Sequence, residues 1–261
     1  MNLGVRGKVG LVFGAGGGLG GAIAKSLSDE GAKVVLADIN DDAATAAATA
    51  ITKTGGEART VQWDLADVAR ISDRMAAVEA LFGPVDILVN NTGGPPPTPA
   101  FGQETTLWTK SFESMVLSVI KVTDAVLPSM RSRKWGRIIT STSSGVVAPI
   151  HNLGISNALR SSLVAWSKTL AREVGADGVT CNIILPGRIA TPRINFLDEK
   201  KAEREGRSID AVASESVASI PVGRYGKPEE YGAVATFLAS QQASYLTGSI
   251  IRVDGGFIQS I

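Results

Sequence analysis

The chain contains 261 residues, 44% of them hydrophobic, and its 26 basic and 25 acidic side chains leave a formal net charge of +1. No basic stripe or charge block is visible, which argues against nucleic acid or an anionic membrane as a partner. No apolar segment resembles a signal peptide or is long enough to span a bilayer, so the cytoplasm is the expected location. The only cysteine, Cys181, lies in an apolar run and is expected in the core.

Strands and helices alternate through most of the chain. Short apolar runs without polar alternation are typical of parallel strands covered on both faces, and they lie at 9–13, 33–37, 59–63, 87–89, 137–141, 180–185 and 249–253. Helical segments are expected between them, at 18–30, 41–54, 68–82, 105–132, 154–175 and 228–239. The alternation predicts a single α/β domain over residues 1–261, with a doubly wound parallel sheet of about seven strands and helices on both faces.

Two segments stand apart from this alternation. The sequence GGPPPTP at 93–99 follows the fourth strand, and its successive prolines favour a stiff polyproline geometry that would form one wall of a site. Residues 193–220 are charged and helix-prone, and their position predicts a lid over a ligand cleft. The alternative for this second segment is a solvated pair of surface helices.

The stretch 9–38 combines a strand, a glycine-rich turn, a helix, a second strand and an acidic residue, Asp38. Glycines let a backbone turn tightly and approach a phosphate, and the helix that follows points free N–H groups at a pyrophosphate. Asp38 can accept hydrogen bonds from both ribose hydroxyls of an adenosine and would repel a 2′-phosphate, so NAD is expected over NADP. The alternative is a flexible glycine loop without a ligand.

Further motifs extend this pattern along the chain. They are Gly14-x-x-x-Gly18-Leu19-Gly20, Asn90-Asn91-Thr92-Gly93, the strand 136–139 with a serine cluster, Pro186-Gly187-Arg188-Ile189-Ala190-Thr191, and Val253-Asp254-Gly255-Gly256. In this order and spacing the chain resembles the short-chain dehydrogenase/reductase family from end to end. The greatest resemblance is to the branch named for β-ketoacyl-carrier-protein reductases. The resemblance implies a homo-oligomer, a tetramer or dimer, with the C-terminal strand at an interface.

The resemblance also implies a set of cofactor-binding residues. The pyrophosphate would lie on the glycine loop, the adenosine on two acidic residues and their neighbours, and the nicotinamide half on two later loops. The implied residues are Gly14, Gly16, Gly17, Gly18, Leu19 and Gly20 for the loop; Asp38, Ile39, Asp64 and Leu65 for the adenosine; and Asn91, Thr92, Gly93, Arg160, Pro186, Gly187, Ile189 and Thr191 for the nicotinamide half. No metal site is expected.

The catalytic half departs from the family pattern. Family members carry an Asn–Ser–Tyr–Lys set, and in this chain only the serine is kept, as Ser143. The tyrosine position is Ser156, the lysine position is Arg160 and the asparagine position is Met115. A serine hydroxyl is a much weaker acid than a phenol, and an arginine does not pass protons along a relay. Arginine can still bind a ribose or a substrate anion with its fork of donors.

Two residues are candidates for the missing roles. Ser143 would polarise a carbonyl oxygen, or it would only cap the end of its strand. His151, the only histidine, lies five residues before Ser156 on a loop that lines the substrate pocket in the family. It would replace the missing acid, or it would be a histidine at the surface or the edge of the core.

Three functions remain open from the sequence. The first is an NAD(H)-dependent oxidoreductase that interconverts a carbonyl and an alcohol, similar to a 3-oxoacyl reductase. In it Ser143 holds the substrate oxygen, and Ser156, His151 or a water handles the proton. Arg160 anchors the cofactor ribose or a substrate carboxylate. The second is a lyase, isomerase or dehalogenase on the same fold, against which the intact glycine loop argues. The third is an inactive NAD-binding sensor or scaffold.

Overall fold

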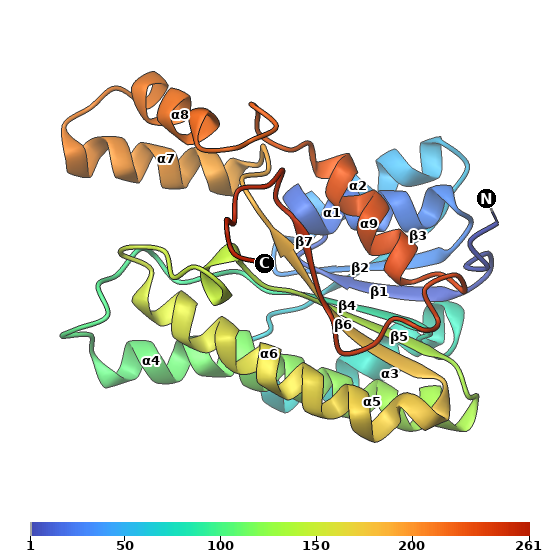
Figure 1. Cartoon of the computed structure of the whole chain (residues 1–261). Coiled ribbons are helices and arrows are strands. Elements are labelled where there is room, and N and C mark those ends of the chain that lie inside the picture. Colours follow the sequence, from blue (N-terminus) through green and yellow to red (C-terminus); the bar gives the residue numbers. More distant parts are fainter. Residues whose placement is uncertain (1) are drawn as a thin grey trace.

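The computed structural model describes residues 2–261, which form a seven-stranded parallel sheet in the order β3-β2-β1-β4-β5-β6-β7 (Figure 1). The strands are β1 (Val9–Phe13), β2 (Lys33–Asp38), β3 (Glu57–Gln62), β4 (Ile87–Asn91), β5 (Gly136–Ser141), β6 (Val179–Pro186) and β7 (Ile250–Val253). The order reverses between β1 and β4, where a doubly wound sheet opens a crevice for ligands at its carboxyl edge. The predicted fold class and strand number are confirmed.

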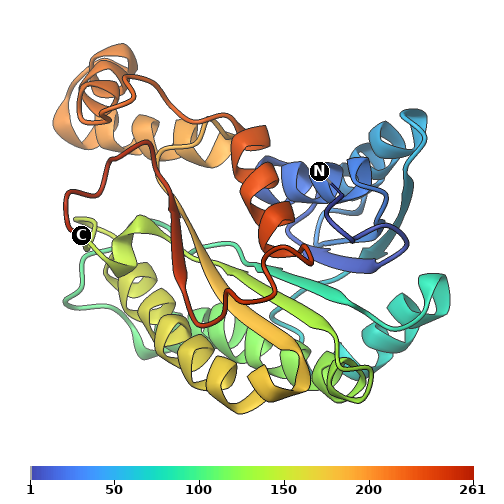
Figure 2. The same cartoon turned by 45° about the vertical axis from the view of Figure 1, so that its right-hand side comes forward.

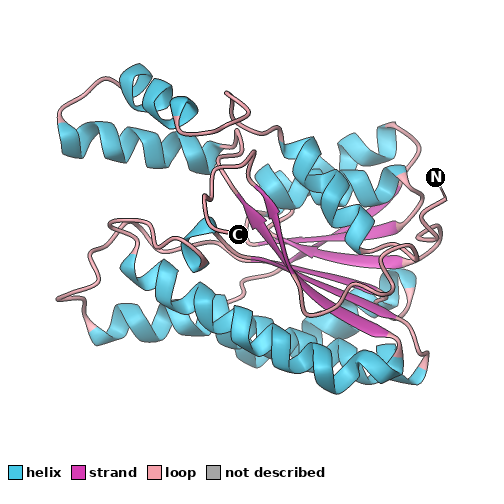
Figure 3. Ribbon diagram, in the orientation of Figure 1, coloured by secondary structure: helices cyan, strands magenta, loops and turns pink. Residues whose placement is uncertain are grey.

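Helices connect successive strands and cover both faces of the sheet (Figure 3). The helices are α1 (Gly18–Asp29), α2 (Asp41–Lys53), α3 (Ile71–Phe82), α4 (Thr105–Phe112), α5 (Ser118–Ser132), α6 (Gly154–Val174), α7 (Pro192–Glu205), α8 (Ile209–Ala218) and α9 (Pro228–Leu238). Short helical turns are η1 (Val68–Arg70), η2 (Glu113–Leu117), η3 (Ser144–Val146) and η4 (Gly175–Asp177).

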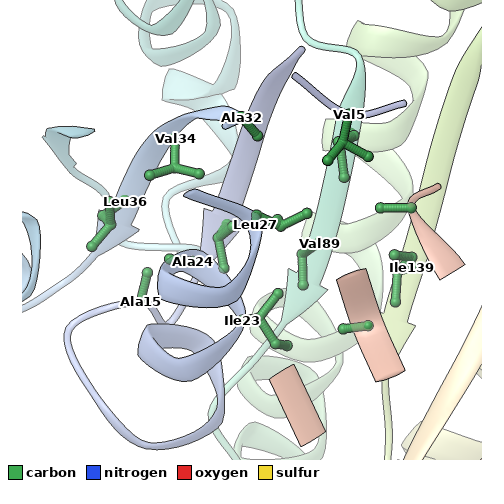
Figure 4. Packing of buried hydrophobic residues seen from close by; sticks show 14 of the residues in the cluster. Val5, Ala15, Ile23, Ala24, Leu27, Ala32, Val34, Leu36, Val89 and Ile139 are labelled. Atoms are coloured by element: carbon green, nitrogen blue, oxygen red, sulfur yellow. The ribbon is translucent and has the colours of Figure 1, made fainter. Parts of the chain in front are cut away.

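Two apolar layers hold the helices on the sheet. On one face, Ile23, Ala24 and Leu27 of α1 pack toward Val34 of β2 and Val89 of β4 (Figure 4), and α9 joins the same cluster. On the other face, side chains of α3, α5 and α6 pack against β1, β2, β4, β5 and β6. Burial on both faces explains why the strands are continuous apolar runs in the sequence.

The helices α7 and α8 lie apart from these two layers. They project at the end of the sheet from which the loop after β4 also extends, and the rotated view shows the same separation (Figures 1 and 2). Thr191 caps α7 by accepting a bond from the Ile194 amide, and Gly206 ends it with φ +62°. Residues 193–220 therefore fall largely in two helices, one of which, α7, lines the cleft described below, and the lid over a ligand cleft stays a prediction.

The predicted helix at 105–132 is divided in the structure. The turn η2 has π-helical geometry and separates α4 from α5. It contains Met115, which is 2% exposed and packs with Ile155 and Leu159 of α6. The π turn contains no glycine or proline that would mark a break, so the sequence pattern alone predicts one helix.

Cys181 lies in β6 and is fully buried as expected, and its burial raises the pKa of the thiol to about 12. We expect no reaction of the native protein with a disulfide reagent such as dithionitrobenzoate at pH 8, because only an accessible thiolate attacks. One thiol per chain is expected to react in denaturant. The measurement is the absorbance of the released thiolate with and without guanidinium chloride, and a rapid native reaction would contradict this burial.

No helix between residues 2 and 261 has both the length and the apolar character required to cross a membrane. Within the same residues, no group of three or more histidine, cysteine, aspartate and glutamate side chains is arranged to hold a metal ion.

Candidate active site

The glycine loop after β1 requires glycine at two of its positions. Gly14 has φ +59°, and a Cβ there would lie 2.7 Å from Nδ2 of Asn91, at the end of β4. A Cβ on Gly20 would lie 2.1 Å from the carbonyl oxygen of Gly14, which is closer than any real contact. The loop and the first turn of α1 are therefore packed backbone to backbone, and the loop has a fixed shape.

The first turn of α1 is uncapped and opens on a cleft. Gly17 precedes the helix without a side-chain hydrogen bond, and no acidic residue lies in the first turn. Gly17, Gly18 and Leu19 line the cleft, and a Cβ on Gly17 would have no atom within 4 Å. Free N–H groups and the positive end of the helix dipole therefore meet open space, an arrangement that suits an anion.

Asp38 at the end of β2 is fixed by two backbone amides. Its Oδ2 accepts a bond from Gly16 N at 2.9 Å, and its Oδ1 accepts one from Asn40 N at 2.9 Å. Each carboxylate oxygen keeps a further acceptor position. The neighbouring Ile39 is 63% exposed, and Asp64 accepts a bond from Ala66 N at 2.8 Å.

One cleft of about 690 Å³ brings most of the predicted site residues together. Its walls come from the glycine loop, the loops after β4, β5 and β6, the start of α6, and one side of α7. The predicted residues that line it are Gly14, Gly17, Gly18, Leu19, Asn91, Thr92, Gly93, Ser143, His151, Ser156, Arg160, Pro186, Gly187, Ile189 and Thr191. The predicted residues outside its lining are Gly16, Gly20, Asp38, Ile39, Asp64 and Leu65.

Arg160 of α6 holds the ends of two strands with its guanidinium group. Nη2 donates to the carbonyl oxygens of Gly93 at 2.8 Å and Thr92 at 3.3 Å, both just beyond β4, and Nη1 reaches that of Ser141 in β5 at 3.5 Å. The side chain is 8% exposed. Burial, together with the nearby charge of Arg193, lowers the pKa of Arg160 to about 10, and the phenol of Tyr231 opposes this shift. The guanidinium therefore stays charged at neutral pH.

The candidate catalytic hydroxyls lie at different depths in the cleft. Ser143 Oγ accepts a bond from Gly145 N at 3.1 Å, so it caps η3, while its own O–H is free to donate to a ligand. Ser156 is 8% exposed and makes no hydrogen bond with its side chain among the described residues. His151 is exposed at the mouth of the cleft, on the loop before α6.

The three tyrosines of the chain do not line the cleft. Tyr231 of α9 is fully buried; its hydroxyl donates to the carbonyl of Ile184 at 3.2 Å and contacts Ser141 Oγ at 2.8 Å. Burial raises the pKa of Tyr231. Tyr225 donates to Asp198 at 2.6 Å, and Tyr245 is fully exposed. No tyrosine therefore occupies the position of the missing phenol.

Four charged residues of the cleft, all in α7, were not predicted from the sequence: Arg193, Lys200, Lys201 and Arg204. Arg193, in the first turn of α7, donates from Nη2 to the carbonyl of Pro95 at 3.0 Å, and it joins α7 to the loop after β4. The sequence does contain a signal for Arg193. Thr191 and Pro192 mark the start of a helix, and the positive end of the helix dipole disfavours a cation such as Arg193 directly after it. A cation at this unfavourable position indicates that it interacts with a group outside the helix.

The cleft fits a nicotinamide dinucleotide in two ways. The uncapped start of α1 offers amide donors and room for a phosphate. The hydroxyls of Thr92 and Thr142 are buried, line the cleft and have no hydrogen-bond partner among residues 2–261. Buried hydroxyls seldom remain unpaired, so these two atoms mark places where a bound molecule would supply the partner.

The chain is similar over nearly its whole length to known reductases and dehydrogenases. Residues 14–258 match the family model described as enoyl-(acyl carrier protein) reductase. The chain is 34% identical over 253 residues to 3-oxoacyl-[acyl-carrier-protein] reductase FabG of Escherichia coli (strain K12), with 96% of this chain and 97% of that protein covered. It is 33% identical over 258 residues to the D-beta-hydroxybutyrate dehydrogenase of Cupriavidus necator, with 97% and 99% covered.

The fold of the chain also matches that of a solved reductase structure. L-sorbose reductase from Gluconobacter frateurii, complexed with NADPH and L-sorbose, superposes with a TM-score of 0.94 at 31% identity, and each chain is covered completely. The match to the family model, the parallel sheet and the glycine loop all indicate the same family. The chain therefore belongs to the short-chain dehydrogenase/reductase family of oxidoreductases, in the branch that resembles 3-oxoacyl-carrier-protein reductases.

Proposed function

We propose that the protein is an NAD(H)-dependent oxidoreductase that interconverts a carbonyl and an alcohol, with a proton donor that differs from the family tyrosine. One observation carries the proposal: the uncapped start of α1 and the hydroxyls of Ser143 and Ser156 line the same cleft. A dinucleotide whose phosphates lie on α1 and a carbonyl near Ser143 would then share one cavity. The intact glycine loop favours this reaction over the non-redox alternatives.

Different residues of the chain would bind the carbonyl oxygen, supply the proton and position the cofactor loop. Ser143 donates a hydrogen bond to the carbonyl oxygen and stabilises the negative charge that develops there. The bound dinucleotide supplies a hydride to the carbonyl carbon in reduction and takes it back in oxidation. The proton that completes the alcohol reaches the oxygen from His151, or from water held by Ser156. Arg160 fixes the loop at Thr92 and Gly93, which borders the nicotinamide ribose in this arrangement.

The proposal is tested by two measurements on the same preparation. Fluorescence titration measures the affinity for NADH, and absorbance at 340 nm measures turnover with ketones, aldehydes and 3-oxoacyl thioesters. We expect micromolar binding and turnover of at least one carbonyl class. Binding without turnover would favour a dinucleotide sensor, and turnover of a substrate without a bound dinucleotide would favour a lyase or dehalogenase.

Two variants identify the proton path. His151→Gln removes the only imidazole, and Ser156→Ala removes the unpaired hydroxyl of α6. General acid catalysis contributes roughly 100- to 10,000-fold. The variant with the larger loss of kcat in the reduction direction locates the donor.

We expect Asp38 to favour NADH over NADPH, because its fixed carboxylate would face the 2′-phosphate of NADPH. The Asp38→Asn change removes the negative charge and keeps an oxygen that can accept the Gly16 amide bond. It should lower the ratio of NADH to NADPH affinity at least tenfold, as measured by fluorescence titration with both cofactors. Asp41→Asn, an exposed change in the first turn of α2, is the control and should leave the ratio unchanged. A native protein that binds NADPH more tightly would refute this cofactor assignment.

We also propose that the protein assembles as a homotetramer or dimer through its C-terminal strand. β7 forms one edge of the sheet, and Ile250 on it is 39% exposed. An exposed edge strand presents unpaired N–H and C=O groups with which a strand of another chain can pair. Light scattering is expected to give a mass two or four times the 27.1 kDa of one chain.

A further inference from the structure

The active-site cleft is strongly basic. Its lining contains six basic side chains and no aspartate or glutamate. The six are Arg160, Arg188, Arg193, Lys200, Lys201 and Arg204. The whole chain has a net charge of only +1, so this concentration of positive charge is local to the cleft. A cleft of one sign of charge raises the local concentration of ligands of the opposite sign.

Four of the six cations are neutralised by carboxylates of the chain. The four ion pairs are Arg188–Asp198 at 2.5 Å, Lys200–Glu203 at 2.7 Å, Lys201–Glu215 at 3.3 Å and Arg204–Glu205 at 3.1 Å. Arg160 and Arg193 form no ion pair with any carboxylate of residues 2–261, and both donate to backbone carbonyls. These two guanidinium groups are the positive charges of the cleft that have no counter-ion among residues 2–261.

Both unpaired arginines lie where a positive charge is unfavourable. Arg160 is 8% exposed, and a buried cation without a counter-ion loses much of its hydration energy. Arg193 lies in the first turn of α7, where the helix dipole opposes a cation and where no acidic residue is present. The Arg193 residue is exposed overall, and partial desolvation lowers the pKa of its guanidinium. A bound anion would offset all of these costs at once.

The two guanidinium groups converge on one point of the cleft. Nη2 of Arg160 and Nη2 of Arg193 each lie 3.5 Å from the position that a Cβ on Gly94 would take. The two atoms are therefore at most twice that distance apart, although they come from α6 and α7. Arg160 also follows Ser156 by four residues, so the two side chains lie on the same face of α6, one turn apart.

We propose that Arg193 and Arg160 bind the carboxylate of the substrate, and that the substrate is therefore a short oxo acid or its hydroxy acid. The inference rests on the proposed function, which places the reacting carbonyl near Ser143 and Ser156. One turn of helix separates Ser156 from Arg160, a spacing that suits an acid whose carboxylate is a few bonds from the carbonyl. The guanidinium of Arg193, of which only Nη2 donates to the chain, keeps donors for two parallel hydrogen bonds to a carboxylate, while Arg160 adds its charge from the other side.

The reaction leaves the carboxylate unchanged. A hydride from the bound dinucleotide joins the carbonyl carbon, a proton joins the carbonyl oxygen, and NADH becomes NAD⁺. The acid group serves only to hold the molecule with its carbonyl toward Ser143. Arg193 is thus a specificity-determining residue on α7, and it also connects α7 to Pro95 across the cleft.

Isothermal titration calorimetry with the protein saturated in NAD⁺ tests this inference without turnover. The probes are acetoacetate and its methyl ester, which differ in charge but share the ketone. We expect acetoacetate to bind at least tenfold more tightly than the ester. Arg193→Gln should remove that difference, and Arg193→Lys should restore part of it because the charge returns without the fork.

The matched control is Lys200→Gln, which removes a paired cation of the same helix and should change acetoacetate affinity less than twofold. Equal binding of acid and ester by the native protein would overturn the inference, as would an Arg193→Gln variant with native acetoacetate affinity. A loss of NAD⁺ affinity in Arg193→Gln with acetoacetate affinity unchanged would assign the anion to the dinucleotide phosphates and would also overturn it. Native preference for the acid without NADH turnover of any carbonyl would refute only the proposed function.

Discussion

The Ser143→Ala change is expected to lower kcat/KM about 100- to 1,000-fold for the best carbonyl substrate, the range seen when one donor to a developing oxyanion is removed. The loss should appear mainly in kcat, because the hydrogen bond strengthens as charge develops on the carbonyl oxygen. NADH affinity should be unchanged, since the dinucleotide is held by other loops. The measurements are initial rates across substrate concentrations and a fluorescence titration with NADH.

Ser143 also accepts the Gly145 amide bond, so a structural effect must be separated from the catalytic one. Ser143→Thr retains a hydroxyl for both roles and should keep most of the activity. Ser161→Ala, an exposed change on α6 outside the cleft, controls for serine replacement in general. If Ser143→Ala keeps native kcat/KM, the hydroxyl only caps η3 and another group must polarise the carbonyl.

Replacement of Gly20 with alanine should destabilise the fold by about 3 kcal/mol or more, because the new methyl group would overlap the Gly14 and Phe13 backbone. The atoms it meets are all main-chain, so no side chain can rotate away. We expect a clear fall in the midpoint of denaturant unfolding, with unchanged m-value. Loss of NADH binding should accompany it, because the same overlap displaces the start of α1.

Gly17→Ala separates the effect on NADH binding from the effect on stability. Its added Cβ would meet no atom within 4 Å, and the backbone there is extended with φ 170°, which alanine adopts readily. Stability should therefore stay within about 0.5 kcal/mol of the native protein. NADH affinity should fall at least tenfold, since the methyl group would occupy the space where a phosphate approaches the helix start. Native NADH affinity in Gly17→Ala would show that no phosphate binds at this turn.

The sheet could be predicted from the sequence almost completely. The inner strands, such as β1, β5 and β6, are runs buried on both faces, so local composition and spacing are sufficient to locate them. The strand ends shifted by one or two residues, as in β3, which was expected at 59–63 and lies at Glu57–Gln62. The glycine positions were equally visible, because a tight turn between a strand and a helix leaves few other residue types.

The interior of the site could not be predicted in the same way. Two of the partners of Arg160 are the backbone carbonyls of Thr92 and Gly93, 68 and 67 residues earlier in the chain, and no local pattern encodes such a contact. The convergence of Arg193 with Arg160 depends on where α7 turns after β6, which the sequence does not specify. The same holds for Tyr231, whose hydroxyl meets Ser141 across 90 residues. Side-chain chemistry was predictable at each position, but the pairing of positions required the fold.

The burial of Cys181 makes this protein convenient for fluorescence spectroscopy. Because the one native thiol is inaccessible within β6, it need not be replaced before a dye is attached elsewhere. A variant such as Glu199→Cys would place a single reactive thiol on the exposed side of α7. A maleimide dye on that variant would report whether the α7–α8 pair moves when a ligand enters.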